Sequence, residues 1–74
     1  MHPKSIHSDE YKEIILKIIK SRNEAGLSQK DVARIINKTQ SYISKIENCQ
    51  LRIDVVQLGE LAKLFNKNIS YFLK

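Results

Sequence analysis

Apolar residues recur along this chain at intervals of three and four rather than at every second position. That spacing gathers apolar side chains on one face of an α-helix, whereas strict alternation would indicate strands. Two glycines and one proline interrupt the 74 residues, so the helical segments have few breaks. The pattern predicts an all-α fold with a single core over residues 8–74, after a disordered N-terminal arm of residues 1–7.

Capping residues predict where the first two helices begin and end. The first should start near Ser8 or Asp9, because their side chains can accept hydrogen bonds from free backbone N–H groups. It should stop at Gly26, the usual residue for a left-handed helix end. The second should open at Ser28, with Asp31 three residues later completing a pattern like a capping box.

Thr39 and Asp54 are the expected caps of a third and a fourth helix, with a loop between them over residues 48–53. A last short helix should cover about residues 69–73, which makes five helices in all. The side chains expected to face the core are Ile14, Ile15, Ile18, Ile19, Val32, Ile36, Ile43, Ile46, Val55, Leu58, Leu61, Ala62 and Phe65.

Residues 28–48 stand out because they predict two short helices joined by a tight turn. Ala33 is small enough to let the two helices cross closely, and Asn37 tolerates the left-handed backbone that such a turn needs. Packing then leaves one polar face of the third helix without a buried role. The side chains of that face are Gln40, Ser41, Ser44 and Lys45.

A short helix with a free polar face is what the major groove of DNA admits. The amide of Gln40 can pair with adenine through two hydrogen bonds, and Lys45 suits the two acceptors of guanine. Gln29, in the first turn of the second helix, lies where backbone N–H groups attract phosphate. The other candidate phosphate contacts are Tyr42, Asn48, Gln50 and Arg52.

The charge balance favours a polyanionic partner. Thirteen Lys and Arg face eight Asp and Glu, for a formal net charge of +5 and a pI near 9.5. Cationic side chains that neutralise phosphates release condensed counterions, which supplies affinity independent of sequence. Composition alone is weak evidence, since small basic domains also bind acidic proteins and membranes.

The segments LSQKDVARIINKTQSYISKIENCQ and LGELAKLFNKNISYFL resemble the phage Cro/repressor type of helix-turn-helix domain, the XRE family. The resemblance runs from about Arg22 to Leu73. It implies a lambda-repressor-like five-helix domain that binds double-stranded DNA. It also implies that Gln29 contacts phosphate, and that an arginine late in the first helix pairs with a glutamate ending the third. The residues implied to read bases are Gln40, Ser41 and Lys45, and the implied ion pair is Arg22 with Glu47.

Two positions depart from the family pattern. Asn37 stands where the turn between the second and third helices usually has glycine, and asparagine tolerates left-handed geometry. Cys49 replaces the glycine that usually follows the third helix, and it would incur a steric penalty at positive φ. We therefore expect that Asn48 takes the left-handed conformation instead, or that the loop follows a different path.

Other chemistry has little support in the sequence. Cys49 is the only cysteine, which fits a reducing cytoplasm, and nothing marks it as a redox switch. His2 and His7 have no further ligands at metal spacing, so no metal is expected. No catalytic set and no cofactor motif can be assembled, so we expect a protein that is not an enzyme. The first helix is basic and amphipathic, yet burial explains its isoleucines better than a membrane surface does.

Self-association is predicted from the carboxyl end, where a short helix cannot bury all its faces in its own domain. The candidate dimer residues are Ile69, Tyr71, Phe72 and Leu73. A homodimer would place two reading helices about 34–36 Å apart, matching a palindromic operator. We predict a transcriptional regulator of the Cro-like repressor or restriction-modification controller type. The alternative is an antitoxin-type module that binds mainly another protein; RNA polymerase or a toxin is a possible partner.

Overall fold

The computed structural model describes residues 8–73 and confirms the all-α prediction with five helices and no strand in that range. The disordered arm predicted for residues 1–7 lies outside the described residues. None of the described helices has the length and apolar character needed to cross a membrane. The helices are α1 Asp9–Glu24, α2 Gln29–Ile35, α3 Gln40–Glu47, α4 Val55–Leu64 and α5 Ile69–Leu73.

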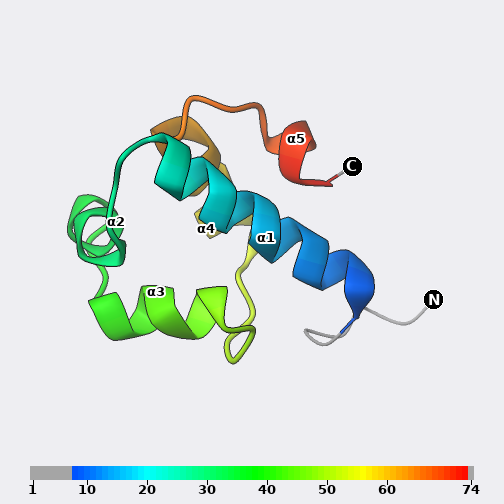
Figure 1. The fold of residues 1–74 in the computed structure, drawn as a ribbon, viewed down its shortest axis with the longest axis horizontal. Coiled ribbons are helices and arrows are strands. Elements are labelled where there is room, and N and C mark those ends of the chain that lie inside the picture. Colours follow the sequence, from blue (N-terminus) through cyan, green and yellow to red (C-terminus); the bar gives the residue numbers. More distant parts are fainter. Residues whose placement is uncertain (1–7, 74) are drawn as a thin grey trace.

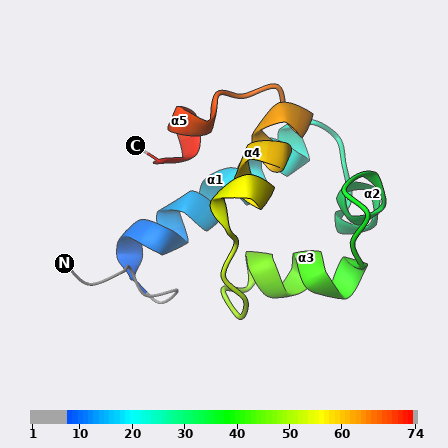
Figure 2. The same cartoon turned by 180° about the vertical axis from the view of Figure 1, so that it is seen from behind.

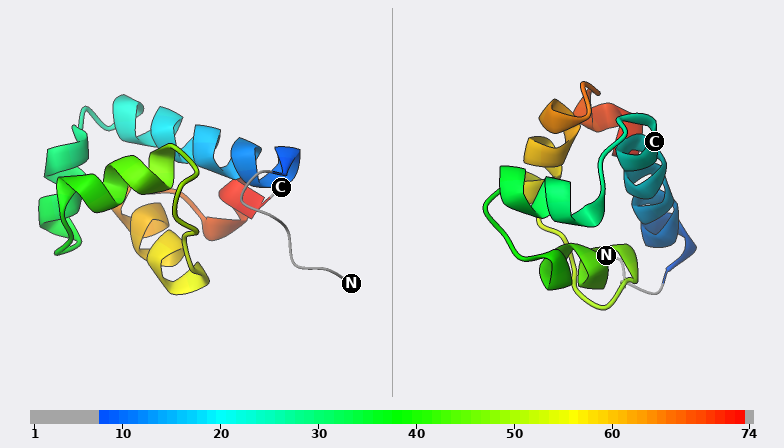
Figure 3. Two further views of the ribbon diagram at one scale, coloured as in Figure 1. Left: turned by 90° about the horizontal axis from the view of Figure 1, so that it is seen from below. Right: turned by 60° about the vertical axis from the view of Figure 1, so that its left-hand side comes forward.

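The longest helix, α1, runs diagonally across the view in Figure 1, with α2 beyond its C-terminal end and α3 below it. α2 packs on α3, α1 contacts both α3 and α5, and α5 also contacts α4. Figure 2 shows α4 on the side of α1 that faces away in Figure 1. The view from below in Figure 3 looks directly onto α3, with no other helix covering it. The fold therefore leaves one side of α3 open to a partner.

The predicted N-terminal caps are confirmed. The Ser8 and Thr39 hydroxyls each accept a hydrogen bond from the backbone N–H three residues later, and the Asp54 carboxylate does the same for α4. Ser28 and Asp31 form a complete capping box at α2. Hydrogen bonds from Ser28, the backbone one first, hold the pKa of Asp31 below its usual value. These caps fix the start of α2 and α3, and hence their crossing.

The first four helices all end in the same way. The residue just beyond the C-cap has positive φ: Gly26 at 72°, Asn37 at 59°, Cys49 at 58° and Asn66 at 57°. Each of these residues donates its N–H to the carbonyl three residues earlier, and the next N–H reaches the carbonyl five residues earlier. This pair of bonds is the Schellman motif. Asn37 therefore closes the turn as predicted.

The expectation for the end of α3 was wrong. Cys49 itself takes the left-handed conformation, while Asn48 has φ of −93°. The two Schellman bonds, Cys49 N–H to Ile46 O at 3.1 Å and Gln50 N–H to Lys45 O at 2.8 Å, hold the backbone there. The hydrogen bonds of the motif thus outweigh the steric cost of a Cβ at this position.

A glycine at position 49 should therefore be more stable than an alanine. We expect Cys49→Gly to exceed Cys49→Ala in free energy of unfolding by about 1 kcal/mol, because both lose the thiol but only alanine keeps the strained Cβ. Urea denaturation of the two variants measures the difference. The same pair at Asn48, where φ is negative, is the control and should show no advantage for glycine. Equal stability of the two position-49 variants would contradict the expectation.

The core confirms most of the predicted buried residues and corrects a few. Ile14, Ile19 and Ile36 are only partly buried, and Val55 is 67% exposed, so its assignment to the core was wrong. Val55 begins α4, and this first turn projects beyond the helices it could pack on (Figure 3). The buried cluster consists of Tyr11, Ile15, Ile18, Val32, Ala33, Ile43, Ile46, Ile53, Leu58, Leu61, Ala62, Phe65 and Phe72.

The carboxyl-terminal helix α5 is more deeply buried than the sequence suggested. Phe72 has no exposed surface, and its ring meets that of Tyr71 edge-on at 5.1 Å. Tyr71 and Ile69 are half-buried against the core cluster, and of the four candidate dimer residues Leu73 alone is exposed, at 57%. Phe72 is therefore a core residue, and its assignment to a dimer contact was wrong because its side chain has no surface to offer a second copy.

Candidate nucleic-acid interface

The open face of α3 carries the polar residues expected there. Successive residues of an α-helix are about 100° apart, so positions 40, 41, 44 and 45 share one side while Ile43 and Ile46 lie opposite, buried in the core. Gln40, Ser41 and Lys45 are exposed and Ser44 is half-buried. The fold therefore brings the four predicted base-reading residues together on one accessible surface.

A chain of polar contacts runs from the interior to this surface. The Arg22 guanidinium donates to both carboxylate oxygens of Glu47, at 2.6 Å from Nε and 3.1 Å from Nη2. The Gln29 amide nitrogen donates to Glu47 at 3.0 Å, and the Gln40 amide nitrogen donates to the Gln29 amide oxygen at 3.1 Å. Four side chains on three helices are thus linked in series.

This series fixes the orientation of both amides. A carboxylate only accepts hydrogen bonds, so Gln29 must turn its nitrogen to Glu47 and its oxygen to Gln40. Gln40 must then turn its nitrogen toward Gln29. Its oxygen and its second N–H stay available at the surface. One acceptor and one donor at the first turn of α3 are what the major-groove edge of an adenine requires.

The ion pair that anchors the series is largely removed from solvent. The side chains of Arg22 and Glu47 are 14% and 6% exposed. Arg22 also donates from Nη1 to the Leu27 carbonyl at 2.9 Å, across the turn between α1 and α2. The pairing that the family resemblance implied is present, and it ties α1 to the last turn of α3.

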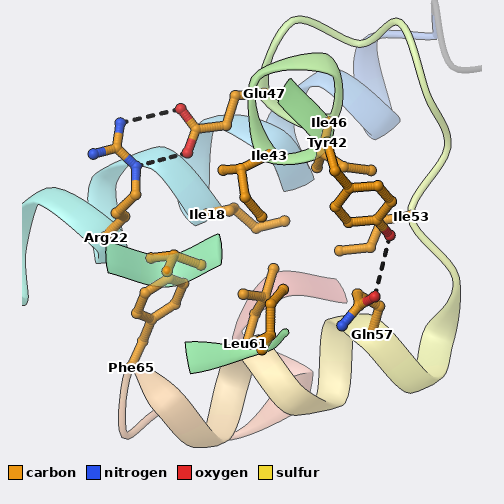
Figure 4. A pocket seen from close by; sticks show the side chains of 12 residues that line it. Ile18, Arg22, Tyr42, Ile43, Ile46, Glu47, Ile53, Gln57, Leu61 and Phe65 are labelled. Atoms are coloured by element: carbon orange, nitrogen blue, oxygen red, sulfur yellow. Dashed lines mark hydrogen bonds and ion pairs between the residues drawn. The ribbon is translucent and has the colours of Figure 1, made fainter. Parts of the chain in front are cut away.

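Tyr42 lies differently from the predicted phosphate contact. Its ring is half-buried against the core, and its hydroxyl donates to the Gln57 amide oxygen at 3.2 Å, as Figure 4 shows. Burial raises the pKa of this hydroxyl, and the negative charge of Asp54 adds to the effect, so it stays a donor. Tyr42 therefore joins α3 to α4 and directs its hydroxyl inward.

A small internal cavity lies between these two polar links (Figure 4). Its volume is about 10 Å³, and its lining is mainly apolar, with Ile18, Ile43, Leu61 and Phe65 around it. That volume is at the limit for a single water molecule and far below what a small-molecule ligand needs. The cavity is therefore a packing gap.

The remaining candidates lie around the edge of the α3 face. Asn48 is exposed and its amide donates to the Ser44 hydroxyl at 3.3 Å. Gln50 is exposed in the following loop. The Arg52 guanidinium lies 5.9 Å from the centre of the Tyr11 ring, toward α1 and away from α2.

Two residues in this region were not singled out from the sequence. Lys38, in the turn before α3, is exposed and places its ammonium 5.3 Å from the centre of the Tyr42 ring. Its position one residue before the predicted cap Thr39 was the signal that could have found it. Gln57 is buried and holds Tyr42. A buried glutamine needs a partner, yet the sequence did not reveal which one.

A metal centre has no basis in the described part of the chain. No group of three or more His, Cys, Asp or Glu residues is placed to hold an ion among residues 8–73. His2 and His7 lie outside the described residues. The half-buried Cys49 is the one cysteine in the sequence.

Comparison with known proteins agrees with this geometry. A family model described as helix-turn-helix, of the Cro/C1 (XRE) type, matches residues 18–72. That range spans α2 and α3 together with the helices that support them. Searches with the whole chain found no significant match among curated proteins or among solved structures. The match covers more than half of the chain, and the chain belongs to the helix-turn-helix family of the Cro/C1 (XRE) type.

Proposed function

We propose that this protein is a cytoplasmic transcriptional regulator that reads operator DNA with the open face of α3. Its role is binding rather than catalysis. Membership of the family supports the general class, a DNA-binding transcription regulator. The formal net charge of +5 adds a favourable interaction with the phosphate backbone.

The observation that carries the proposal is the held amide of Gln40. Its nitrogen is bound to Gln29, which is itself bound to the buried Glu47, so the amide is oriented before any DNA arrives. A preoriented side chain loses less conformational freedom on binding than a free glutamine would. We assign Gln40 to an adenine, and Ser41, Ser44 and Lys45 to neighbouring bases.

Phosphate contacts on both sides would hold α3 in register. Gln29 and the exposed Lys38 lie toward α2 and the turn before α3. Asn48 and Gln50 lie on the loop that follows α3, whereas the Arg52 guanidinium lies 5.9 Å from the centre of the Tyr11 ring of α1 and has no part in this role. We propose the same role for these two groups, one on each flank of the reading helix. The inward hydroxyl of Tyr42 gives it a structural role instead.

We further propose that the protein binds a palindromic operator as a homodimer, like a phage Cro-type repressor or a restriction-modification controller. Two copies related by a two-fold axis would present two α3 helices to successive major grooves about 34–36 Å apart. In vitro selection from a random DNA pool gives the operator, and its symmetry and half-site spacing report the arrangement of the copies.

The reading role of α3 is tested by alanine substitution on the selected operator. Gln40→Ala should remove about 1–3 kcal/mol of discrimination at one base pair, because the bidentate pair with adenine is lost. Lys45→Ala should relax preference at another position. Lys20→Ala, on an exposed part of α1, is the charge-matched control and should leave base preference intact. Binding is measured against single-base operator variants at one fixed salt concentration.

Three results would contradict the proposal. One is the absence of salt-dependent binding to duplex DNA. Another is a base preference that survives both Gln40→Ala and Lys45→Ala. The third is loss of preference in Lys20→Ala to the same degree as in Lys45→Ala, since a general loss of charge would then explain the effect. The first result would favour an antitoxin-type module whose main partner is a protein, and the other two would remove the base-reading role from these side chains.

A further inference from the structure

An apolar surface without a partner lies at the start of α4. Six large hydrophobic side chains are exposed among the described residues, and three of them, Leu51, Val55 and Val56, fall within six consecutive positions. Val55 and Val56 are 67% and 70% exposed and form the first turn of α4. Leu73, also exposed, lines the same hollow as Val55. We call Leu51, Val55, Val56 and Leu73 the α4 patch.

The fold gives these valines no internal role. The inward face of α4 passes through Leu58, Leu61 and Ala62, which are nearly fully buried. Val55 and Val56 are about 100° apart on the helix, so together they cover a broad outer surface of its first turn. Clustered apolar side chains left in water mark an interaction site more often than single ones do.

A hollow of about 190 Å³ lies directly beside the patch. Its apolar lining includes Ile14 of α1, Val55 and Leu58 of α4, and Leu73 of α5. Val56 and Leu51 stand outside this hollow. A protruding apolar side chain next to an apolar hollow is self-complementary, because under a two-fold axis each copy can fill the hollow of the other.

The charges around the hollow favour a second copy over other partners. Two copies that each carry a formal charge of +5 repel overall, so their contact needs local neutralisation. Arg52 and Asp54 both line the hollow and differ by two positions in the chain. A two-fold axis through the patch can set Arg52 of each copy against Asp54 of the other, which neutralises both pairs in one contact.

The position of the patch also suits the reading face. The segment from Asn48 to Asp54 leads directly from α3 to α4, so the patch lies to one side of α3 (Figures 1 and 2). Seen from below in Figure 3, the first turn of α4 projects at the edge of the molecule and does not cover α3. A copy docked on the patch therefore does not have to cover α3.

We propose that the α4 patch is the contact surface between two copies of this chain. The proposal rests on the proposed function, which requires two reading helices on one operator. The sequence predicted a dimer contact on α5, but there Phe72 is wholly buried and Ile69 and Tyr71 are half-buried. The proposed contact lies instead on the loop before α4 and on the first turn of that helix. Leu73 is the residue that the two surfaces share.

The test is sedimentation of the purified protein without DNA, over a concentration series. Val56→Lys should raise the dimer dissociation constant by about tenfold or more, because a lysine ammonium would enter an apolar contact. Arg52→Glu should also weaken the dimer, since it would oppose Asp54 with a like charge. Leu16→Lys is the matched control: Leu16 is 64% exposed on α1, outside the patch, and this variant should dimerise as the unchanged protein does.

Circular dichroism checks that each variant is folded, which is expected because Val56 and Leu16 are both exposed. A Val56→Lys protein that stays dimeric would overturn the proposal, and so would an unchanged protein that is monomeric even on a two-half-site operator. In the second case another protein must cover the patch. A Val56→Lys monomer that still prefers the operator half-site supports both proposals. Loss of dimerisation in a protein without any base preference supports the contact surface while the proposed function fails.

Discussion

Replacing Arg22 by alanine is expected to lower the free energy of unfolding by about 3–5 kcal/mol. Glu47 would then keep only the hydrogen bond from Gln29 in a place where its side chain is 6% exposed. A carboxylate left there without its cation cannot regain the water it lost on folding. Since a domain of this size has only a few kcal/mol in reserve, the variant should be largely unfolded in mild denaturant.

A second ion pair in the same protein supplies the control for this prediction. Arg34 and Asp31 form a pair whose side chains are 76% and 36% exposed. Arg34→Ala removes one partner and leaves the Ser28–Asp31 capping box in place. Its cost should be at most about 0.5 kcal/mol, because exposed pairs contribute little. Urea denaturation of Arg22→Ala and Arg34→Ala compares the same chemical change at a buried and at an exposed site.

The buried pair should also behave as a unit. Replacing Arg22 by methionine and Glu47 by leucine together should restore much of the loss, because no unpaired charge then remains in the interior. If Arg22→Ala and Arg34→Ala lowered the free energy of unfolding equally, burial could not be the reason that the Arg22–Glu47 pair stabilises the fold. A double variant no more stable than Arg22→Ala would show that packing, rather than the unpaired charge, causes the loss.

Local sequence signals predicted the helices well because the caps act over three or four residues. Ser28 with Asp31, and Asp54 with the N–H of Gln57, need no information from distant parts of the chain. The same holds for Asn37, whose side chain tolerates the left-handed turn. Once the caps fix where the helices begin, the helical spacing of the isoleucines predicts the fold class and the polar face of α3.

The contacts that link distant segments could not be predicted in the same way. Tyr11 and Ile53 are 42 positions apart, and the Tyr11 hydroxyl accepts from the Ile53 N–H at 3.0 Å. The Tyr42 hydroxyl donates to the side chain of Gln57, which lies on another helix. A tyrosine in a sequence shows an apolar ring and a polar tip, and only the packing decides where the tip finds its partner.

The backbone conformation of Cys49 and the burial of Phe72 both differ from what the sequence pattern predicted, for different reasons. At Cys49 the residue type argued against positive φ, yet two backbone hydrogen bonds at the end of α3 impose it. At Phe72 the short helix suggested spare apolar surface, yet α5 lies where both α1 and α4 can cover it. At Cys49 a local backbone motif overrides the preference of the residue type, and at Phe72 the tertiary arrangement covers the surface that a short helix would leave exposed.

Phe72→Ala is the second variant with a large expected effect, a loss of about 3–5 kcal/mol in free energy of unfolding. The ring has no exposed surface, so its removal leaves a cavity between α5 and the helices it packs on, and the edge-on contact with Tyr71 is lost. Leu16→Ala is the control, because that side chain is 64% exposed and its truncation should change stability by no more than about 0.5 kcal/mol.

The same variant separates the core role of Phe72 from a role in dimerisation. Under conditions where Phe72→Ala is still folded, its dimer dissociation constant should stay close to that of the unchanged protein, since the ring does not reach the surface. Val56→Lys should show the opposite behaviour, with stability nearly kept and the dimer weakened. Urea denaturation measures the stability of both variants, and sedimentation measures their dimerisation. A Phe72→Ala protein of normal stability that no longer dimerises would place the ring at the contact between copies and would contradict its burial in the core.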